Sequence, residues 1–129
     1  MLVFFGNFER NENASAAEWF TSVALPIVRA ELPDVSLKLV GTGSDRLAAR
    51  LALPGVTGTG FVEDPSEFFS RCAYAIAPLF EGAGVKFKVL EALACGVPVL
   101  GTAVACEGIP EHPLPVSYTH LTLPTIPLV

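Results

Sequence analysis

The sequence has little positive charge and no long apolar run. Its 129 residues contain eight Lys and Arg against thirteen Asp and Glu, which gives a formal net charge of −5. The cations are scattered, so the basic patch that holds a nucleic-acid backbone is missing and we expect no nucleic-acid partner. No segment approaches the roughly 18–20 apolar residues of a membrane span, and the start "MLVFFGNFER" lacks the basic region of a signal sequence. We therefore expect a cytoplasmic protein with no membrane contact from this segment.

Cysteine is scarce, and its spacing excludes the usual cysteine-rich sites. Cys72, Cys95 and Cys106 are odd in number, form no C-x-x-C pair and lie in apolar stretches. This pattern favours reduced, buried thiols over disulfides or a metal centre, so we expect no metal site. Apolar residues make up 51% of the chain, enough for the core of one domain.

Charge disappears entirely from the last part of the chain. Residues 115–129, "PVSYTHLTLPTIPLV", contain no Asp, Glu, Lys or Arg. The stretch "PVSYTHLTLPT" also closely resembles a translation of the adapter used in transposase-based sequencing libraries. We therefore predict that residues 1–114 are the native domain and that residues 115–129 are an adapter-derived, non-native tail. The alternative is a native apolar strand near the C-terminus.

Short apolar runs alternate with helical patterns along the rest of the chain. Strand patterns cover residues 2–6, 35–41, 56–62, 73–79 and 97–102, and helical patterns lie near 15–27, 45–52, 64–72 and from 85 onward. Ser15 and Glu18 have capping-box spacing at the start of the first helix, and Pro26 should kink or divide it. Because parallel strands need crossover connections, this rhythm predicts an α/β fold: a Rossmann-like parallel sheet with helices on both faces.

In such a sheet ligands bind beyond the carboxyl ends of the strands, where the glycine turns of this sequence lie. The first turn to consider is "LVGTGSDR", in which Gly41 and Gly43 give G-x-G but Arg46 occupies the position of the third glycine. The dinucleotide fingerprint is therefore incomplete, and a tight turn between strand and helix is the alternative interpretation.

The stretch "GAGVKFKVLEALACGVPVLGT", residues 83–103, combines a glycine turn with a charged pair. If Gly82 and Gly84 form the turn, the backbone N–H groups of the following helix favour a phosphate. Lys88 and Glu91 are three residues apart and lie on one helical face, where a lysine would contact the phosphate and a carboxylate could accept hydrogen bonds from ribose hydroxyls. The alternative is a surface Lys–Glu pair with no ligand.

The longer stretch "APLFEGAGVKFKVLEALACGVPVLGTAVACEGI" resembles the donor-binding motif of glycosyltransferases with two Rossmann-like domains (GT-B), particularly the family 4 group. The upstream stretches "LVFFGNF" and "VTGTGFVEDPSEFFSRCAYAIAPL" follow in that family's order. The resemblance implies that Glu91 holds the donor ribose, and that Gly84 and Gly6 lie near the diphosphate. It also implies a diphosphate role for Lys88. Backbone groups of Phe61 and Val62 would line the base pocket.

The sequence departs from the family pattern at two places. Position 83 is Ala where many members carry a glutamate, and the nearest acid is Glu81. Many members also have an Arg and a Lys after the first strand, whereas this chain has Asn7 and Glu12 there, with Arg10 as the nearby cation. Diphosphate binding would then depend on Lys88, Arg10 and backbone donors.

The resemblance implies a partial GT-B C-terminal domain that binds a UDP- or GDP-sugar and passes its sugar to a glycan, lipid or small acceptor. No cofactor is implied, since the nucleotide sugar is the donor substrate. An N-terminal acceptor domain would be missing, so we expect the fragment to be inactive alone. Two alternatives remain: a non-catalytic nucleotide- or sugar-phosphate-binding module, and an NAD-dependent oxidoreductase, which the absent third glycine disfavours.

Overall fold

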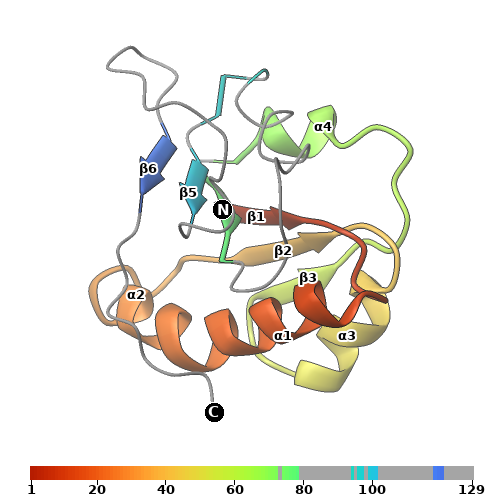
Figure 1. Cartoon of the computed structure of the whole chain (residues 1–129). Helices are drawn as coiled ribbons and strands as arrows, with labels where there is room; N and C mark the ends of the chain where they lie inside the picture. The colour runs from red at the N-terminus through yellow and green to blue at the C-terminus, as the bar shows by residue number, and fades with distance from the viewer. Residues whose placement is uncertain (73, 79–93, 95, 98, 102–117, 121–129) are drawn as a thin grey trace.

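The computed structural model describes residues 1–72, 74–78, 94, 96, 97, 99–101 and 118–120. Its strands form one sheet of six in the order β3-β2-β1-β4-β5-β6, with every pairing parallel (Figure 1). The strands are β1 (Leu2–Phe5), β2 (Leu37–Val40), β3 (Val56–Gly58), β4 (Tyr74–Ala77), β5 (Val99–Gly101) and β6 (Tyr118–His120). This is the order of a doubly wound Rossmann-like sheet. The first three strands are added toward one edge, and β4 then returns to the other side of β1, so that later strands are added toward the opposite edge. The predicted α/β fold is confirmed.

The central strand β1 explains why its sequence is an uninterrupted apolar run. Leu2 pairs with Leu37 of β2 on one side and with Tyr74 of β4 on the other. Val3 and Phe4 are fully buried, because helices cover both faces of a parallel sheet. Burying side chains of this size contributes about 1.5–3 kcal/mol each, so β1 anchors the core.

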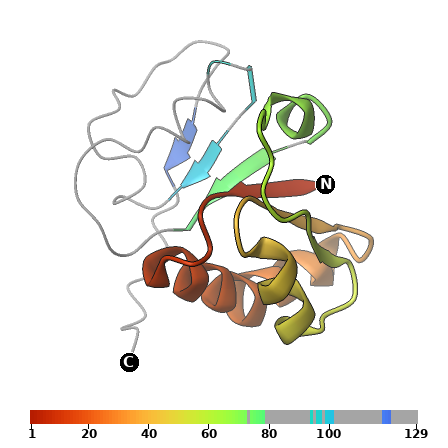
Figure 2. The same cartoon turned by 90° about the vertical axis from the view of Figure 1, so that its right-hand side faces the viewer.

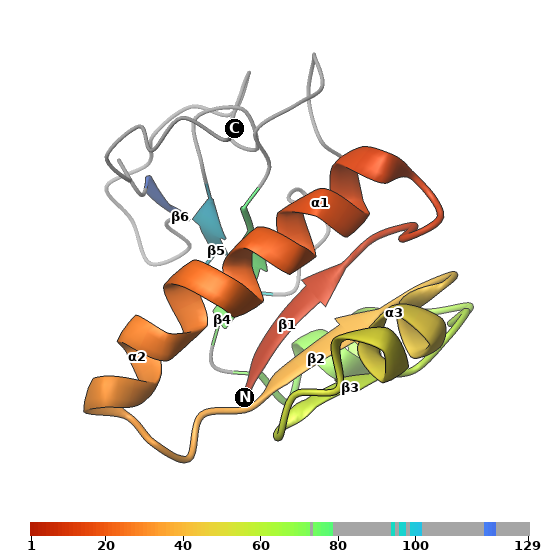
Figure 3. The same cartoon turned by 90° about the horizontal axis from the view of Figure 1, so that it is seen from below.

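Helices cover both faces of the sheet, as the sequence predicts. The helical segments α1 (Asn11–Trp19), η1 (Phe20–Ala24), α2 (Leu25–Glu31) and α3 (Ser44–Leu51) lie on one face, and α4 (Ser66–Phe69) lies on the other (Figure 1). Crossovers are right-handed, so the steps from β1 to β2 and β3 place their helices together, and the return to β4 places α4 opposite. Figure 3, seen from the first helical face, shows α1 and α3 over the strands.

Aromatic contacts tie β1 to the loop before α1 and to α4. The rings of Phe4 and Phe8 are arranged edge to face on the side of α1, with their centroids 5.0 Å apart. The rings of Phe5 and Phe69 meet at 6.2 Å on the side of α4. Because adjacent strand residues point to opposite faces, this one strand holds both layers.

The first helix begins earlier than its capping-box pattern predicts. It starts at Asn11, after Arg10 in an extended conformation, and Ser15 lies inside the helix, so the predicted cap at Ser15 is wrong. Asn13 is buried, and its side-chain amide donates a hydrogen bond of 2.9 Å to the backbone oxygen of Asn7. This bond fixes the incoming loop to the first helical turn, which sequence periodicity alone does not reveal.

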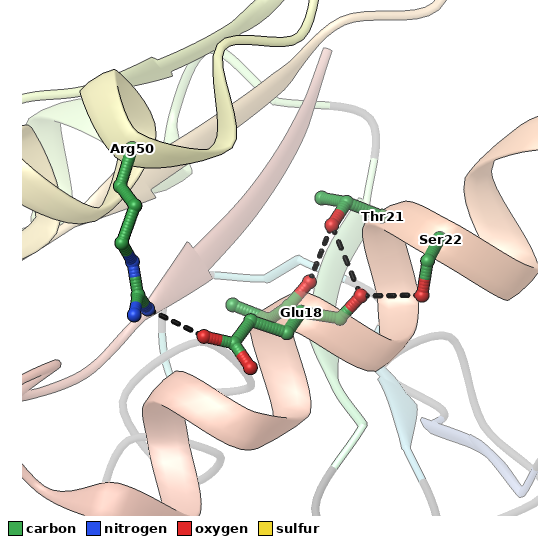
Figure 4. A network of polar contacts seen from close by, with 5 residues as sticks. Glu18, Thr21, Ser22 and Arg50 are labelled. Atoms are coloured by element: carbon green, nitrogen blue, oxygen red, sulfur yellow. Dashed lines mark hydrogen bonds and ion pairs between the residues drawn. The ribbon is translucent and has the colours of Figure 1, made fainter.

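The predicted division of this helix at Pro26 is confirmed. A π-helical segment, η1, separates α1 from α2, and Leu25 donates its backbone N–H to the carbonyl five residues earlier. Pro26 has no N–H to continue the regular pattern, and the wider turn accommodates the missing donor. The hydroxyls of Thr21 and Ser22 donate to the backbone oxygen of Glu18 at 3.1 and 2.7 Å (Figure 4).

Two later elements are shorter than predicted. The strand expected over 56–62 ends at Gly58, and the helix expected over 64–72 is confined to α4. The carboxylate of Asp64 accepts the backbone N–H of Ser66 at 3.0 Å, and this hydrogen bond lowers the pKa of that carboxyl. The result is a turn before the helix in place of a longer helix.

Part of the predicted tail belongs to the sheet. β6 belongs to residues 115–129 and pairs with β5, with Val99 opposite Tyr118. Whether these residues are native stays a prediction, because an adapter-derived segment with apolar character can also pair with an open strand edge.

Across the described part of the chain, no helix is long and apolar enough to span a membrane. Cytoplasmic location stays a prediction.

Candidate functional site

Three loops gather at the carboxyl ends of the strands, the edge that faces the viewer in Figure 2. They are the β1–α1 loop (6–10), the β2–α3 turn (41–43) and the β3–α4 loop (59–65). The backbone N–H of Phe8 donates to the oxygen of Thr42 at 2.8 Å, and the N–H of Gly41 donates to the oxygen of Gly60 at 3.1 Å. Each loop is therefore hydrogen-bonded to its neighbour through the backbone, and the edge forms one continuous surface.

Glycines allow the loops to approach this closely. Gly41 has φ +129°, and a Cβ built on it would lie 1.9 Å from the backbone oxygen of Gly6. A Cβ on Gly58 would lie 2.1 Å from the backbone oxygen of Ser44. No side chain fits at either position, so backbone contact itself requires these glycines.

The predicted Gly6 lies in this packed edge. It is buried, and its N–H donates to the backbone oxygen of Val40 at 2.9 Å, which extends the β1–β2 pairing by one residue. The chain then turns away from the sheet toward α1. Gly6 therefore fixes where the β1–α1 loop leaves the strand, and its phosphate role stays a prediction.

Ser44, which the sequence analysis did not single out, connects two of the loops. Its side chain is fully buried, and its hydroxyl oxygen accepts the N–H of Gly60 at 2.9 Å. Its own N–H donates to the oxygen of Gly41 at 3.1 Å. The G-x-G stretch is thus a tight turn into α3, with Gly43 at φ +80° before the first helical residue. Its position directly after the glycine turn is the signal in the sequence that could have identified it.

Arg10, the predicted diphosphate ligand, ends the β1–α1 loop at the start of α1. Its guanidinium lies 2.8 Å from the carboxylate of Glu12, and its side chain is 66% exposed. Asn7, at the other end of the loop, accepts the N–H of Glu9 on its side-chain oxygen at 3.0 Å. The loop therefore offers a cation at the edge, and a neighbouring carboxylate offsets its charge.

Phe61 and Val62 follow β3 at the same edge. The ring of Phe61 is 76% exposed, an unusual position for a large apolar side chain, whereas Val62 is half-buried and packs against the core. Gly60, at φ +75°, makes the turn that places them there. An exposed aromatic ring next to a backbone turn has the chemistry to contact a flat heterocycle.

The structure thus brings four of the predicted site residues to one edge: Gly6, Arg10, Phe61 and Val62. The other four, Gly82, Gly84, Lys88 and Glu91, lie outside the described residues, and their roles stay predictions. β4, which precedes them in the chain, ends at Ala77 beside β1. That position is the switch point of the sheet, where ligands of this fold bind.

A pocket of about 210 Å³ lies between the β1–α1 loop, the β2–α3 turn and α3. Arg46 and Arg50 line it, and each forms an ion pair across the helical layer, Arg46 with Glu9 at 3.2 Å and Arg50 with Glu18 (Figure 4). All four side chains are largely exposed, so each pair contributes at most about 1 kcal/mol. The pairs balance charge and connect α3 to α1 and its loop, so the pocket carries no net positive charge for an anion.

Among the described residues, no three His, Cys, Asp or Glu side chains come together as metal ligands. The described cysteine, Cys72, is a half-buried thiol whose sulfur lies 3.3 Å from the backbone oxygen of Phe69. That the site needs neither a metal nor a cofactor stays a prediction.

Comparison with known proteins identifies the family. The family described as "Glycosyl transferases group 1" matches residues 1–117. The chain belongs to this family. The resemblance found in the sequence to glycosyltransferases of GT-B type is therefore confirmed. The three loops described above lie at the carboxyl edge of the sheet in this glycosyltransferase domain.

Individual relatives agree with this assignment. An "Uncharacterized 44.6 kDa protein in cps region" of Klebsiella pneumoniae is 26% identical over 117 residues, covering 83% of this chain and 30% of the relative. A phosphatidyl-myo-inositol mannosyltransferase of Propionibacterium freudenreichii is 31% identical over 102 residues, covering 78% of this chain and 25% of the relative. The chain thus spans less than a third of the length of these curated relatives.

Solved structures show the same fold. The pneumococcal O-GlcNAc transferase GtfA, crystallised with UDP and GlcNAc, superimposes with a TM-score of 0.66 at 20% identity, over 87% of this chain and 22% of that chain. WaaG, a glycosyltransferase involved in lipopolysaccharide biosynthesis, superimposes with a TM-score of 0.55 at 26% identity, over 81% of this chain and 29% of that chain. Both likenesses support the GT-B assignment of this sheet and its helices.

Proposed function

We propose that this chain is the donor-binding part of a glycosyltransferase that moves a sugar from a UDP- or GDP-sugar to a glycan, lipid or small acceptor. The observation that carries the proposal is the hydrogen-bonded edge of three loops at the carboxyl ends of the strands, in a chain of the glycosyltransferase group 1 family. GtfA, which shares the fold, was crystallised with UDP, and this supports a nucleotide as the ligand class.

The diphosphate would lie against the β1–α1 loop and the start of α1. The first backbone N–H groups of a helix have no partner within the helix and favour an anion. Arg10 ends the same loop, and its side chain is 66% exposed, so its guanidinium can exchange Glu12 for a phosphate at small cost. These groups would also stabilise the charge that grows on the diphosphate as the glycosidic bond breaks.

The base would lie at one end of this site, with the ribose between the base and the diphosphate. Phe61 and Val62 follow β3 and would line the base pocket, in part through backbone groups. Glu91 would accept hydrogen bonds from the ribose hydroxyls, and Lys88 and the glycine turn at 82–84 would hold the diphosphate, as the sequence motif predicts. The acceptor would be held by a further, N-terminal domain, with transfer between the two, and the enzyme would act in the cytoplasm.

A second candidate is a module that binds a nucleotide or sugar phosphate without catalysis. Two observations favour it: Arg10 is paired with Glu12, and Ala83 stands where many family members carry a glutamate. Both would weaken contacts to the sugar diphosphate. The first candidate predicts release of a nucleoside diphosphate from the sugar donor, and the second predicts binding without release.

The test is sugar transfer by the protein at its full natural length. We expect release of UDP or GDP from a matching hexose donor, accelerated by an acceptor, and no release by residues 1–114 alone. Tight nucleotide binding without any release would favour the module. Transfer by residues 1–114 alone would contradict the need for a further domain.

A further inference from the structure

Asp45 lies beside the turn that presents Phe61. A Cβ built on Gly60 would lie 3.5 Å from the side-chain carboxyl carbon of Asp45 and 3.7 Å from each of its oxygens. Two hydrogen bonds fix this arrangement: the N–H of Gly60 to the buried hydroxyl of Ser44, and the N–H of Gly41 to the oxygen of Gly60. The start of α3 therefore holds a carboxylate next to the residue that precedes the exposed ring.

Both groups are accessible to a ligand. Asp45 is exposed, and Phe61 is 76% exposed. Aromatic rings stack on bases without selecting among them, so a neighbouring polar group has to supply selectivity. An ionised carboxylate only accepts hydrogen bonds, which makes it selective for a base edge that carries donors.

Guanine and uracil differ at that edge. Guanine presents two adjacent donors, the ring N1–H and the exocyclic amino group, and one carboxylate can accept both. Uracil presents one donor, N3–H, between two carbonyl oxygens, and a carboxylate facing it is repelled by at least one of them. A carboxylate at the base pocket therefore favours guanine.

We propose that Asp45 selects guanine in the base pocket and that the donor is a GDP-sugar. This inference rests on the proposed function, because it assumes that the base lies at Phe61. The competing explanation is that Asp45 only stabilises the start of α3 through the helix dipole. That role would be independent of the base, so base preference separates the two explanations.

The experiment is calorimetric titration of the protein at its full natural length with GDP and with UDP. The variants are Asp45→Asn and Asp45→Ser, and the control is Asp34→Asn. Asp34 is an exposed carboxylate in the connection between α2 and β2, at the opposite edge of the sheet. Thermal unfolding of each variant reports any loss of helix stability.

We expect the unaltered protein to bind GDP about tenfold or more tightly than UDP, the size of one or two hydrogen bonds to a charged group. Asp45→Asn should weaken GDP binding by about tenfold and strengthen UDP binding. The reason is that the amide can donate to a uracil carbonyl while it accepts from N3–H. Asp45→Ser should lose GDP affinity without gaining UDP, and Asp34→Asn should change neither.

Three results would overturn the inference. Preference of the unaltered protein for UDP would contradict guanine selection directly. An equal change in both affinities in Asp45→Asn, together with a lower melting temperature, would assign Asp45 to helix stability. Binding of neither nucleotide would overturn the proposed function itself, which distinguishes that failure from a wrong base.

Discussion

Replacing Gly41 by alanine should damage the candidate site severely. The new Cβ would lie 1.9 Å from the backbone oxygen of Gly6, and φ at this position is +129°. Neither atom belongs to a flexible side chain, so β1 and β2 would have to separate at their carboxyl ends. Backbone strain of about 1–3 kcal/mol and overpacking of about 1–3 kcal/mol together give an expected loss of about 2–6 kcal/mol in unfolding free energy.

Gly96→Ala is the matched control for this variant. Gly96 also has a positive φ, +77°, but a Cβ there would meet no atom of the described residues within 4 Å. Only the left-handed backbone conformation is penalised, at about 1–2 kcal/mol. The difference between the two variants therefore measures the contact between Gly41 and Gly6.

Urea unfolding of both variants, followed by circular dichroism, is the assay. We expect Gly41→Ala to unfold at a clearly lower urea concentration than Gly96→Ala, with an unchanged dependence on urea if both stay two-state. Because the β1–α1 loop leaves the sheet at Gly6, Gly41→Ala should also weaken nucleoside diphosphate binding below its unfolding midpoint. Equal losses of stability in the two variants would refute the argument that the loops need this close approach.

Three further changes test other parts of the structure. Glu12→Gln should strengthen nucleoside diphosphate binding about 2–5-fold at low salt, because Arg10 loses its competing partner; unchanged affinity in calorimetry would remove Arg10 from the site. Ala52→Gly should stabilise the protein by about 1 kcal/mol in urea unfolding, because residue 52 ends α3 at φ +50°; a loss of stability would contradict this. The pKa of Asp64 is lowered by its hydrogen bond from Ser66, so its contribution to folding stability is present above the unfolded pKa of about 4 and disappears as pH falls through the lower folded pKa. Asp64→Asn should remove this part of the pH dependence of stability, and an identical stability profile for the variant would argue against it.

The sequence predicts the sheet well because its strands are buried on both faces. The apolar run at residues 2–5 and the division at Pro26 follow from local chemistry that needs no knowledge of the tertiary structure. The direction of the crossovers then limits the possible strand orders to a few. The start of the first helix could not be predicted in this way, because it depends on the contact between Asn13 and Asn7, six residues apart.

The candidate site is less predictable, since its residues come from separate loops. Gly6 and Phe61 were found through family resemblance, and the structure places both at the carboxyl edge. Ser44 and Asp45 were missed because their importance depends on contact with Gly60, fifteen or more residues later in the chain. No periodicity within one helix reports a contact of that range.

That the domain binds a nucleotide sugar, with Glu91 at the donor ribose, can be tested by nucleoside diphosphate titration of the protein at its full natural length and of its Glu91→Ala variant. Glu31→Ala, which removes an exposed carboxylate at the end of α2, is the control. We expect micromolar-range binding of GDP or UDP that falls by about tenfold or more in Glu91→Ala and is unchanged in Glu31→Ala. Equal affinity in all three proteins, or no binding of either nucleotide, would contradict it.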